Sequence, residues 1–289
     1  MAAALEEALR HHVRVLCHEI GPRSVLESDG LERAQDYIAA DFAKAGLEVE
    51  EQAYDYRGRR VANLIARPPG AAAGDTTIIG AHYDTVPGTP GADDNASAVA
   101  VLLETARRVR QPPCPLAFIA FTLEEPPAHT SRWQGSRAYL RSIGRQGRRD
   151  LKAAIVLEMV GYTAPKQHYP WAVRWLGYPA EGNYIGLIGD GRSRHLVRTV
   201  ERGFRQNPGL PVETLCVPLR GWLLPATRLS DHASFWDRGI PALMVSDTAF
   251  FRNPHYHLPS DRLETLDFAF MAQLVRSLEL AVAELAVAG

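Results

Sequence analysis

Five short stretches of the chain group histidine and carboxylate side chains in a way that suits metal binding. They are His82–Asp84, Asp93–Asp94, Glu124–Glu125, Glu158 and His255–His257. They offer imidazole nitrogen and carboxylate oxygen but no sulfur, a ligand set that fits zinc, cobalt or manganese. Five protein ligands are too many for one open tetrahedral site, but they suffice for two ions that share one carboxylate. Such a pair of ions makes a nucleophile by helping a bound water to lose a proton near neutral pH.

Each stretch has a simpler interpretation when it is taken alone. Asp93–Asn95 could cap the helix that follows, because Asp and Asn are favoured N-caps. Glu124–Glu125 could lie in a solvated loop, and His82 could be a hydrogen-bonded structural histidine. Glu158 is harder to explain in this way, because it follows an apolar run and a buried carboxylate is costly unless it is paired or coordinated. The metal hypothesis therefore depends on the combination.

Predicted strands explain how these side chains would meet. Three apolar runs, each typical of a buried strand, lead directly into the candidate residues: Thr76–Ala81, Pro115–Thr122 and Lys152–Leu157. Further strands are predicted at Glu48–Tyr54, Val61–Ala66, Tyr184–Ile188, Val212–Val217 and Ala242–Val245. Helices are predicted at Leu31–Ala45, Ala96–Val109, Gly135–Ile143, Ser193–Arg205, Ser230–Asp237 and along Phe268–Val287. This alternation predicts a largely parallel sheet covered on both faces, with ligands beyond the carboxyl ends of its strands.

The composition is that of an ordinary globular protein. The 289 residues are 46% hydrophobic, and 32 Lys+Arg against 33 Asp+Glu give a net charge of −1. This balance argues against nucleic acid as a partner. No stretch of about 18 apolar residues predicts a membrane span. The first twenty residues lack a signal-peptide core, which favours a cytoplasmic protein and leaves export open. The oligomeric state is not readable from the sequence.

Several motifs together resemble a known family. They are Gly80-Ala-His-Tyr-Asp-Thr-Val-Pro-Gly, Gly91-Ala-Asp-Asp-Asn-Ala-Ser, Phe121-Thr-Leu-Glu-Glu, Leu157-Glu-Met-Val-Gly-Tyr and His257-Leu-Pro-Ser-Asp, with Ile20-Gly-Pro-Arg upstream. In this order they resemble the co-catalytic dizinc aminopeptidases of the bacterial leucyl aminopeptidase type. That family also holds glutamate carboxypeptidases and glutaminyl cyclases. The resemblance implies one three-layer α/β/α zinc-peptidase domain over residues 1–289, with a mixed, mostly parallel central sheet.

The resemblance also implies an activity and a role for each ligand. The enzyme would be a zinc-dependent aminopeptidase that hydrolyses N-terminal residues from peptides or small amides through a metal-bridged hydroxide. Two divalent ions, with zinc as the default, would be held by His82, Asp93, Glu125, Glu158 and His257. Asp93 would bridge both ions, and the Asp93–Asp94 peptide bond would be cis.

Further residues have expected roles beside the ligands. The resemblance makes Glu124 the general base. Asp84 stands two residues after His82, a spacing that lets its carboxylate hold the far imidazole nitrogen. His255 competes with His257 as a ligand, and the family spacing to Asp261 favours His257. Asp261 could order the His257 loop or cap the next helix. Ser230 or Asp231 is interpreted first as a helix N-cap and second as part of the active-site edge.

The sequence leaves the roles of two loops undecided between alternatives. Pro126–Gln134, which includes His129 and Trp133, is longer than usual and either narrows the active site or forms a surface excursion. Gln167–Tyr178, with Trp171 and Trp175, is either a substrate wall or a packed hydrophobic loop. Two other functions compete with an aminopeptidase: a glutaminyl cyclase-like acyltransferase and a non-catalytic peptide-binding relic of a hydrolase.

Overall fold

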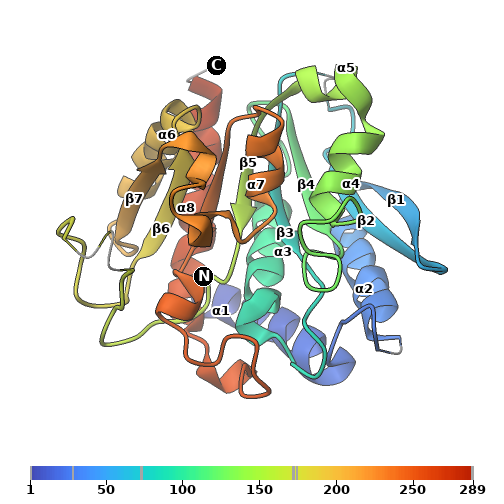
Figure 1. The fold of residues 1–289 in the computed structure, drawn as a ribbon, viewed down its shortest axis with the longest axis horizontal. Coiled ribbons are helices and arrows are strands. Elements are labelled where there is room, and N and C mark those ends of the chain that lie inside the picture. The colour runs from blue at the N-terminus through green and yellow to red at the C-terminus, as the bar shows by residue number, and fades with distance from the viewer. Residues whose placement is uncertain (1, 28, 72–73, 171–172, 174, 288–289) are drawn as a thin grey trace.

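A computed structural model describes residues 2–27, 29–71, 74–170, 173 and 175–287 (Figure 1). Its centre is an eight-stranded sheet with the order β1-β2-β4-β3-β5-β8-β6-β7. The strands are β1 (Glu48–Tyr56), β2 (Arg59–Arg67), β3 (Thr76–His82), β4 (Leu116–Phe121), β5 (Leu151–Leu157), β6 (Ile185–Asp190), β7 (Val212–Val217) and β8 (Ala242–Ser246). All eight predicted strands are present, although most of their ends differ by one or a few residues.

The sheet is mixed and mostly parallel, as the resemblance implies. β4, β3, β5 and β8 pair in parallel in that spatial order, and β6 pairs in parallel with β7. The antiparallel pairs are β1 with β2, β2 with β4, and β6 with β8. Because β3, β4 and β5 are neighbours and run in the same direction, the residues that follow them leave the sheet at one edge.

Helices cover both faces of the sheet (Figure 1). One face carries α1 (Ala2–Arg14), α2 (Gly30–Lys44), α3 (Ala98–Arg108), α6 (Arg194–Arg205) and α8 (Phe268–Val287), and the other carries α4 (Gly135–Ser142) and α7 (His232–Asp237). α5 (Gly144–Arg149) follows α4. The π-helical turns η1 (Val15–Ile20) and η2 (Ala92–Ser97) extend α1 and precede α3. Short 3-10 turns are η3 (Leu219–Gly221), η4 (Pro225–Arg228), η5 (Ala249–Phe251) and η6 (Leu263–Thr265).

Helix α8 is apolar but has a polar side. Most of its aliphatic residues are buried against α1, α3 and α6, whereas Glu279 pairs with Arg108 at 2.7 Å and Glu284 with Arg202 at 3.1 Å. This is the amphipathic helix that the sequence predicts. None of the helices in the described part of the chain has the combination of length and apolarity that a membrane crossing requires.

Candidate metal centre

The centre begins at His82, the last residue of β3. Its side chain is fully buried. Nδ1 lies 3.2 Å from the backbone carbonyl of Asp84 and 3.5 Å from the Asp84 carboxylate. A proton on Nδ1 would satisfy that carbonyl, which leaves the lone pair of Nε2 directed toward the candidate ligands. Nε2 has no hydrogen bond within the described structure.

Asp94 lies between the two candidate histidines. Its Oδ1 is 3.4 Å from Nε2 of His82, and its Oδ2 is 3.1 Å from Nε2 of His257. Glu125 completes this cluster, with Oε1 3.2 Å from Nε2 of His257. His82, Asp94 and Glu125 can each offer one ligand atom within 4.8 Å of the others. Asp94 is therefore the carboxylate that faces both candidate histidines.

The assignment of Asp93 to the shared position is wrong in this geometry. Asp93 accepts hydrogen bonds from the Gly161 amide at 2.9 Å and the Asn253 side-chain amide at 2.6 Å, which fix both of its carboxylate oxygens elsewhere. The cis peptide bond was expected between Asp93 and Asp94. In the structure it joins Asp94 to Asn95. The two aspartates are adjacent and chemically identical, so only the local backbone decides which one faces the histidines.

Two buried residues hold that backbone. The Asp261 carboxylate accepts the amides of Asp93 and Asp94 at 2.9 and 3.0 Å. Arg23 is fully buried, and its guanidinium donates to the carbonyls of Tyr83 and Gly91 at 2.8 and 2.9 Å. Arg23 thus joins the end of β3 to the segment that leads into Asp94. Asp261 orders the aspartate pair, a role that neither sequence interpretation foresaw.

Glu124 and Glu125 follow β4 after Thr122 and Leu123, and the Asp84 carboxylate fixes their backbone. Its Oδ1 and Oδ2 accept the amides of Glu124 and Glu125, each at 3.0 Å. Asp84 therefore contacts the His82 ring and both glutamates. The His82 ring donates from Nδ1 to the Asp84 carbonyl, whereas the Asp84 carboxylate orders the neighbouring strand end.

Glu158 follows β5 and approaches the same nitrogen of His82 that faces Asp94. Its Oε2 lies 3.4 Å from Nε2 of His82 and accepts the Ser230 hydroxyl at 2.6 Å. Ser230 thus orients a candidate ligand, and the structure records no side-chain cap for it at α7. The next residue, Asp231, accepts bonds from Gln134 at 3.0 Å and Ser136 at 2.5 Å.

His257, not His255, reaches the cluster. Tyr256 stacks on the His257 ring with centroids 3.7 Å apart and an interplanar angle of 20°. His255 is turned toward Ser260, whose hydroxyl lies 3.0 Å from its Nδ1. The sequence left these two histidines as competitors, and the geometry favours His257.

The concentrated charge shifts the protonation of the ligand groups. Burial would lower the pKa of His82, but the carboxylates of Glu158, Asp84 and Asp94 raise it well above its ordinary value. Burial, followed by repulsion from Asp94, raises the pKa of Glu125 to about 8. Burial raises the pKa of Glu158 to about 7 although His82 opposes the change. Without cations, Glu125 and Glu158 therefore hold their protons more tightly than they would beside a positive ion.

These residues fit a metal centre on structural grounds. Nε2 of His82 and Oδ1 of Asp94 are both buried, face each other, and form no hydrogen bond among the described residues. Buried polar atoms without partners are costly, and a cation between them would satisfy both. Histidine and carboxylate ligands suit zinc, and Asp84 and Ser230 supply the outer contacts that metal ligands commonly have.

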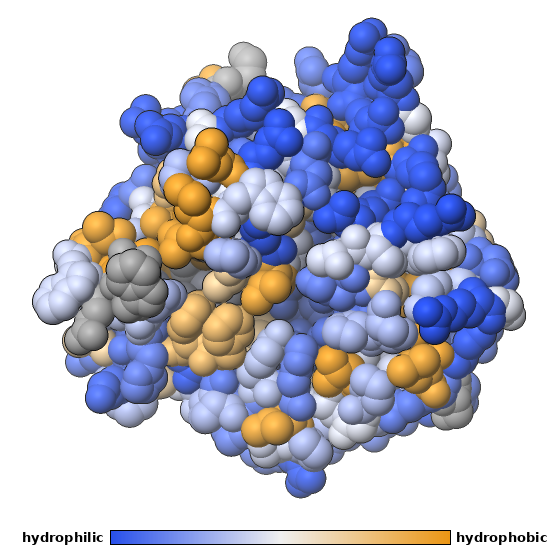
Figure 2. All heavy atoms as spheres, viewed as in Figure 1, coloured by the Kyte–Doolittle hydropathy of each residue, from blue (hydrophilic) through white to orange (hydrophobic). Residues whose placement is uncertain are grey.

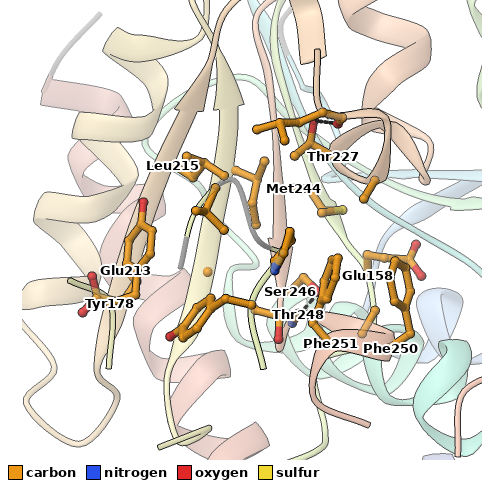
Figure 3. A pocket seen from close by; sticks show the side chains of 18 of the residues that line it. Glu158, Tyr178, Glu213, Leu215, Thr227, Met244, Ser246, Thr248, Phe250 and Phe251 are labelled. Atoms are coloured by element: carbon orange, nitrogen blue, oxygen red, sulfur yellow. Dashed lines mark hydrogen bonds between the residues drawn. The ribbon is translucent and has the colours of Figure 1, made fainter. Parts of the chain in front are cut away.

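An apolar cavity of about 210 Å³ opens beside the centre. Glu158 belongs to its lining, and Figure 3 shows Glu158 on one side of the cavity with Tyr178 and Glu213 on the opposite side. The apolar lining of the cavity includes Leu215, Met244 and Phe251. Figure 2 shows apolar side chains gathered on the left half of the visible face, where Figure 1 places β6 and β7.

Two tyrosines of the Gln167–Tyr178 loop line this cavity. Tyr169 and Tyr178 stack with centroids 5.9 Å apart, and both line the cavity. Trp175 is 82% exposed and is not part of the lining. Trp171 lies outside the described residues.

The fold is a helix-covered α/β sheet with a candidate metal centre at one edge, and the comparison with known proteins supplies the family. Residues 63–281 match peptidase family M28. The chain belongs to this family of peptidases.

Two relatives illustrate its place in the family. The uncharacterized protein YfbL of Escherichia coli strain K12 is 38% identical over 286 residues, covering 94% of this chain and 86% of YfbL. A probable leucine aminopeptidase of Trichophyton verrucosum is 30% identical over 228 residues, covering 73% of this chain. This chain spans 54% of that fungal relative.

Solved structures share the fold. BSAP, a zinc aminopeptidase from Bacillus subtilis, matches with a TM-score of 0.74 and 16% identity, covering 97% of this chain and 95% of BSAP. The glutaminyl cyclase of Porphyromonas gingivalis matches with a TM-score of 0.71 and 19% identity, covering 97% of this chain and 98% of the cyclase. At these identities the likeness establishes the fold alone, so the reaction must be argued from the site.

Proposed function

We propose that the protein is a zinc-dependent aminopeptidase with two metal ions in one catalytic domain over residues 1–289. One observation carries this proposal: the two carboxylate oxygens of Asp94 face two different histidines, at 3.4 and 3.1 Å. A carboxylate with one oxygen toward each imidazole is suited to bridging two cations. The leucine aminopeptidase names among the relatives support an exopeptidase that acts on the N-terminus.

The ligands divide into two sets around Asp94. His82 and Glu158 approach one side, and His257 and Glu125 approach the other. Each set provides three protein ligands when Asp94 is counted in both, which leaves positions for water and substrate. When bound, the ions would lower the pKa of a water and polarise the substrate carbonyl.

Glu124 would serve as general base and then as general acid. Its side chain is nearly buried, and Asp84 fixes its backbone amide at 3.0 Å. In peptide hydrolysis a carboxylate must take a proton from the attacking water and deliver a proton to the leaving amine. Glu125, the next residue, contacts His257, so the two neighbouring glutamates divide proton transfer and metal binding between them.

The apolar cavity would receive the side chain of the substrate's N-terminal residue. Its lining includes Glu158, so it lies directly beside one of the proposed metal ligands. Apolar cavities of about 150 Å³ hold a benzene ring, so this one has room for a leucine or phenylalanine side chain. Apolar N-terminal residues are therefore the expected substrates.

The proposal is tested by measuring metal content and hydrolysis together. Purified protein reconstituted with zinc should retain close to two ions per chain after dialysis and should cleave leucyl-p-nitroanilide. Glu124→Gln should lower kcat by a factor of about 100 or more, because it removes the proton acceptor. Its zinc content should stay at the wild-type level, because Glu124 is not a ligand.

Three results would contradict the proposal in different ways. Zinc below about one ion per chain would remove the metal pair. Full activity of Glu124→Gln would remove the general base. Cyclisation of an N-terminal glutaminyl peptide without anilide cleavage would instead identify a cyclase.

A further inference from the structure

The Pro126–Gln134 loop is anchored against the centre and is not a free surface excursion. At its start, the amides of Ala128 and His129 donate to the Glu125 carbonyl at 3.1 and 3.2 Å. At its end, Gln134 accepts the Thr130 amide at 3.0 Å and donates to the buried Asp231 carboxylate at 3.0 Å. The Tyr54 hydroxyl on β1 donates to the Trp133 carbonyl at 2.7 Å. The loop therefore presents its side chains in fixed positions.

His129 is the loop residue that reaches the general base of the proposed mechanism. Its Nδ1 lies 2.9 Å from the Glu124 carbonyl oxygen and 3.0 Å from Oε1 of the Glu124 carboxylate. Within the described part of the chain, no other side chain forms a hydrogen bond or ion pair with that carboxylate. Oε1 is buried and accepts no hydrogen bond of good geometry. The nitrogen of His129, at 3.0 Å, is its ion-pair partner.

We propose that His129 is a positioning residue for Glu124, an inference that rests on the proposed function. A carboxylate that transfers protons must keep one oxygen toward the water and the leaving amine, and small errors of position lower the rate. His129 donates from Nδ1 to the Glu124 carbonyl, and the same nitrogen lies within ion-pair distance of Oε1, at 3.0 Å. The ring would therefore restrain Oε1 electrostatically and leave the other carboxylate oxygen for the substrate. Asp84 fixes the Glu124 amide, and His129 fixes its carbonyl and one carboxylate oxygen. Both ends of the residue are then restrained.

A purely structural role for His129 predicts a different outcome. If the ring only anchors the loop, its loss should lower stability or metal content and leave the rate per metal-loaded molecule unchanged. If the ring positions Glu124, its loss should lower kcat and leave KM and zinc content nearly unchanged. Measuring the stability, the zinc content, kcat and KM on the same preparation therefore separates the two roles.

The experiment compares His129→Leu with His129→Asn on the zinc-loaded protein. Leu removes the nitrogen, and kcat for leucyl-p-nitroanilide should fall about 10- to 100-fold, the usual effect of losing an outer contact at a metal site. Asn can place its amide nitrogen near the position of Nδ1, so kcat should recover to within about fivefold of wild type. KM should change less than about twofold in both. If the Leu variant does not fold, His129→Ala replaces it.

A double variant and a loop control complete the test. In the Glu124→Gln background, His129→Leu should cause no further loss, because residues that act through one group are not additive. Arg132→Ala, at an exposed position of the same loop, should behave like wild type. Wild-type kcat in His129→Leu, or a loss that Asn does not rescue, overturns the positioning role. An inactive Glu124→Gln beside a fully active His129→Leu defeats this inference alone, whereas an active Glu124→Gln defeats the proposed function.

Discussion

Asp94 and Asp93 illustrate how much depends on the direction of a single side chain. Both are buried acids in consecutive positions, yet Asp94 faces two imidazoles and Asp93 faces the Gly161 amide and Asn253. Burial raises the pKa of Asp93, whereas hydrogen bonds from His257 and His82 lower the pKa of Asp94 against the effect of burial. The two carboxylates therefore differ in the sign of their pKa shift as well as in the direction of the side chain.

The same substitution at these two positions should have different effects. Asp94→Asn should weaken zinc binding by at least about 100-fold, because it removes one charged oxygen from a shared ligand. Asp93→Asn should keep its zinc but lower the free energy of unfolding by about 1–3 kcal/mol, because an amide cannot accept from both Gly161 and Asn253. Zinc content after dialysis and urea unfolding test this pair. Loss of zinc in Asp93→Asn alone would reverse the assignment.

The identity of most candidate ligands is readable from the sequence, but their directions are not. His82, Glu125 and Glu158 follow apolar runs that predict strands, so their convergence at one sheet edge follows from local pattern. The choice between Asp93 and Asp94 depends on Asp261, more than 160 residues away in sequence. No local periodicity carries that information. The contacts of Ser230, Asn253 and His129 have the same long-range origin.

At the scale of elements, the centre depends on how neighbouring strand ends are held together. The end of β3 carries His82, and the chain after β4 carries Glu124 and Glu125. Asp84 connects the two through hydrogen bonds of 3.0 Å to both glutamate amides. A charged acceptor for two buried amides is stronger than a neutral one, so Asp84 should set the spacing between the ligands.

Asp84→Asn should loosen this connection without removing a ligand. The amide side chain can accept from only one of the two backbone N–H groups, so the other is left unsatisfied. Zinc affinity, measured by competition with a chelating dye, should fall about 10- to 100-fold. Asp55→Asn is the matched control, because Asp55 accepts the Gly58 amide at 3.1 Å in an exposed hairpin. Equal zinc affinity in the two variants would contradict the role of Asp84.

Two elements, β7 and α8, have their predicted bounds. For α8 the reason is the clear periodicity of a long amphipathic helix, whereas most of β7 is only partly buried. α1 was not predicted, although Leu5, Leu9 and Val13 recur at helical spacing and are buried. The basic run Arg10–His12 obscured that stripe. His12 is nevertheless buried, because Tyr37 and Glu104 contact its ring at 2.6 and 3.1 Å.

At the scale of the whole molecule, the apolar cavity is built from segments that are distant in sequence. Its walls come from the Gln167–Tyr178 loop, from β6, β7 and β8, and from the segments around η4 and η5. Such a cavity cannot be derived from any one segment, and the sequence alone gave no side-chain preference for this reason. Its selectivity is nevertheless testable, because single residues on its wall can be changed.

Leu215→Asp should reverse the proposed preference for apolar N-terminal residues. A carboxylate on the cavity wall must be desolvated when an apolar side chain enters, so kcat/KM for leucyl and phenylalanyl anilides should fall about tenfold or more. The alanyl anilide should be less affected, because its side chain reaches less of the wall. Leu219→Asp, at a position 68% exposed and outside the lining, is the matched control. Equal losses for all three substrates would argue against this cavity as the side-chain pocket.

His232 should make the stability of the molecule depend on pH. The ring is fully buried, donates from Nε2 to the Thr227 carbonyl at 2.7 Å, and contacts Trp236 edge-on with centroids 4.5 Å apart. Its Nδ1 is buried and forms no hydrogen bond within the described structure. Burial lowers the pKa of His232 from 6.5 to about 4 in the folded state. The folded protein therefore holds this histidine neutral while the unfolded chain protonates it.

The sign of the effect follows from proton binding. Between pH 6.5 and 4 the unfolded state binds the proton and the folded state does not, so stability is complete above pH 6.5 and falls as the pH decreases to 4. The loss approaches about 3 kcal/mol across this range. His232→Phe should reduce the slope of the unfolding free energy against pH by the contribution of one proton. Urea unfolding of zinc-free protein at several pH values measures this slope. His195→Phe, on the exposed side of α6, should keep the wild-type slope. Parallel curves for wild type and His232→Phe would mean that this histidine is not the source of the acid sensitivity.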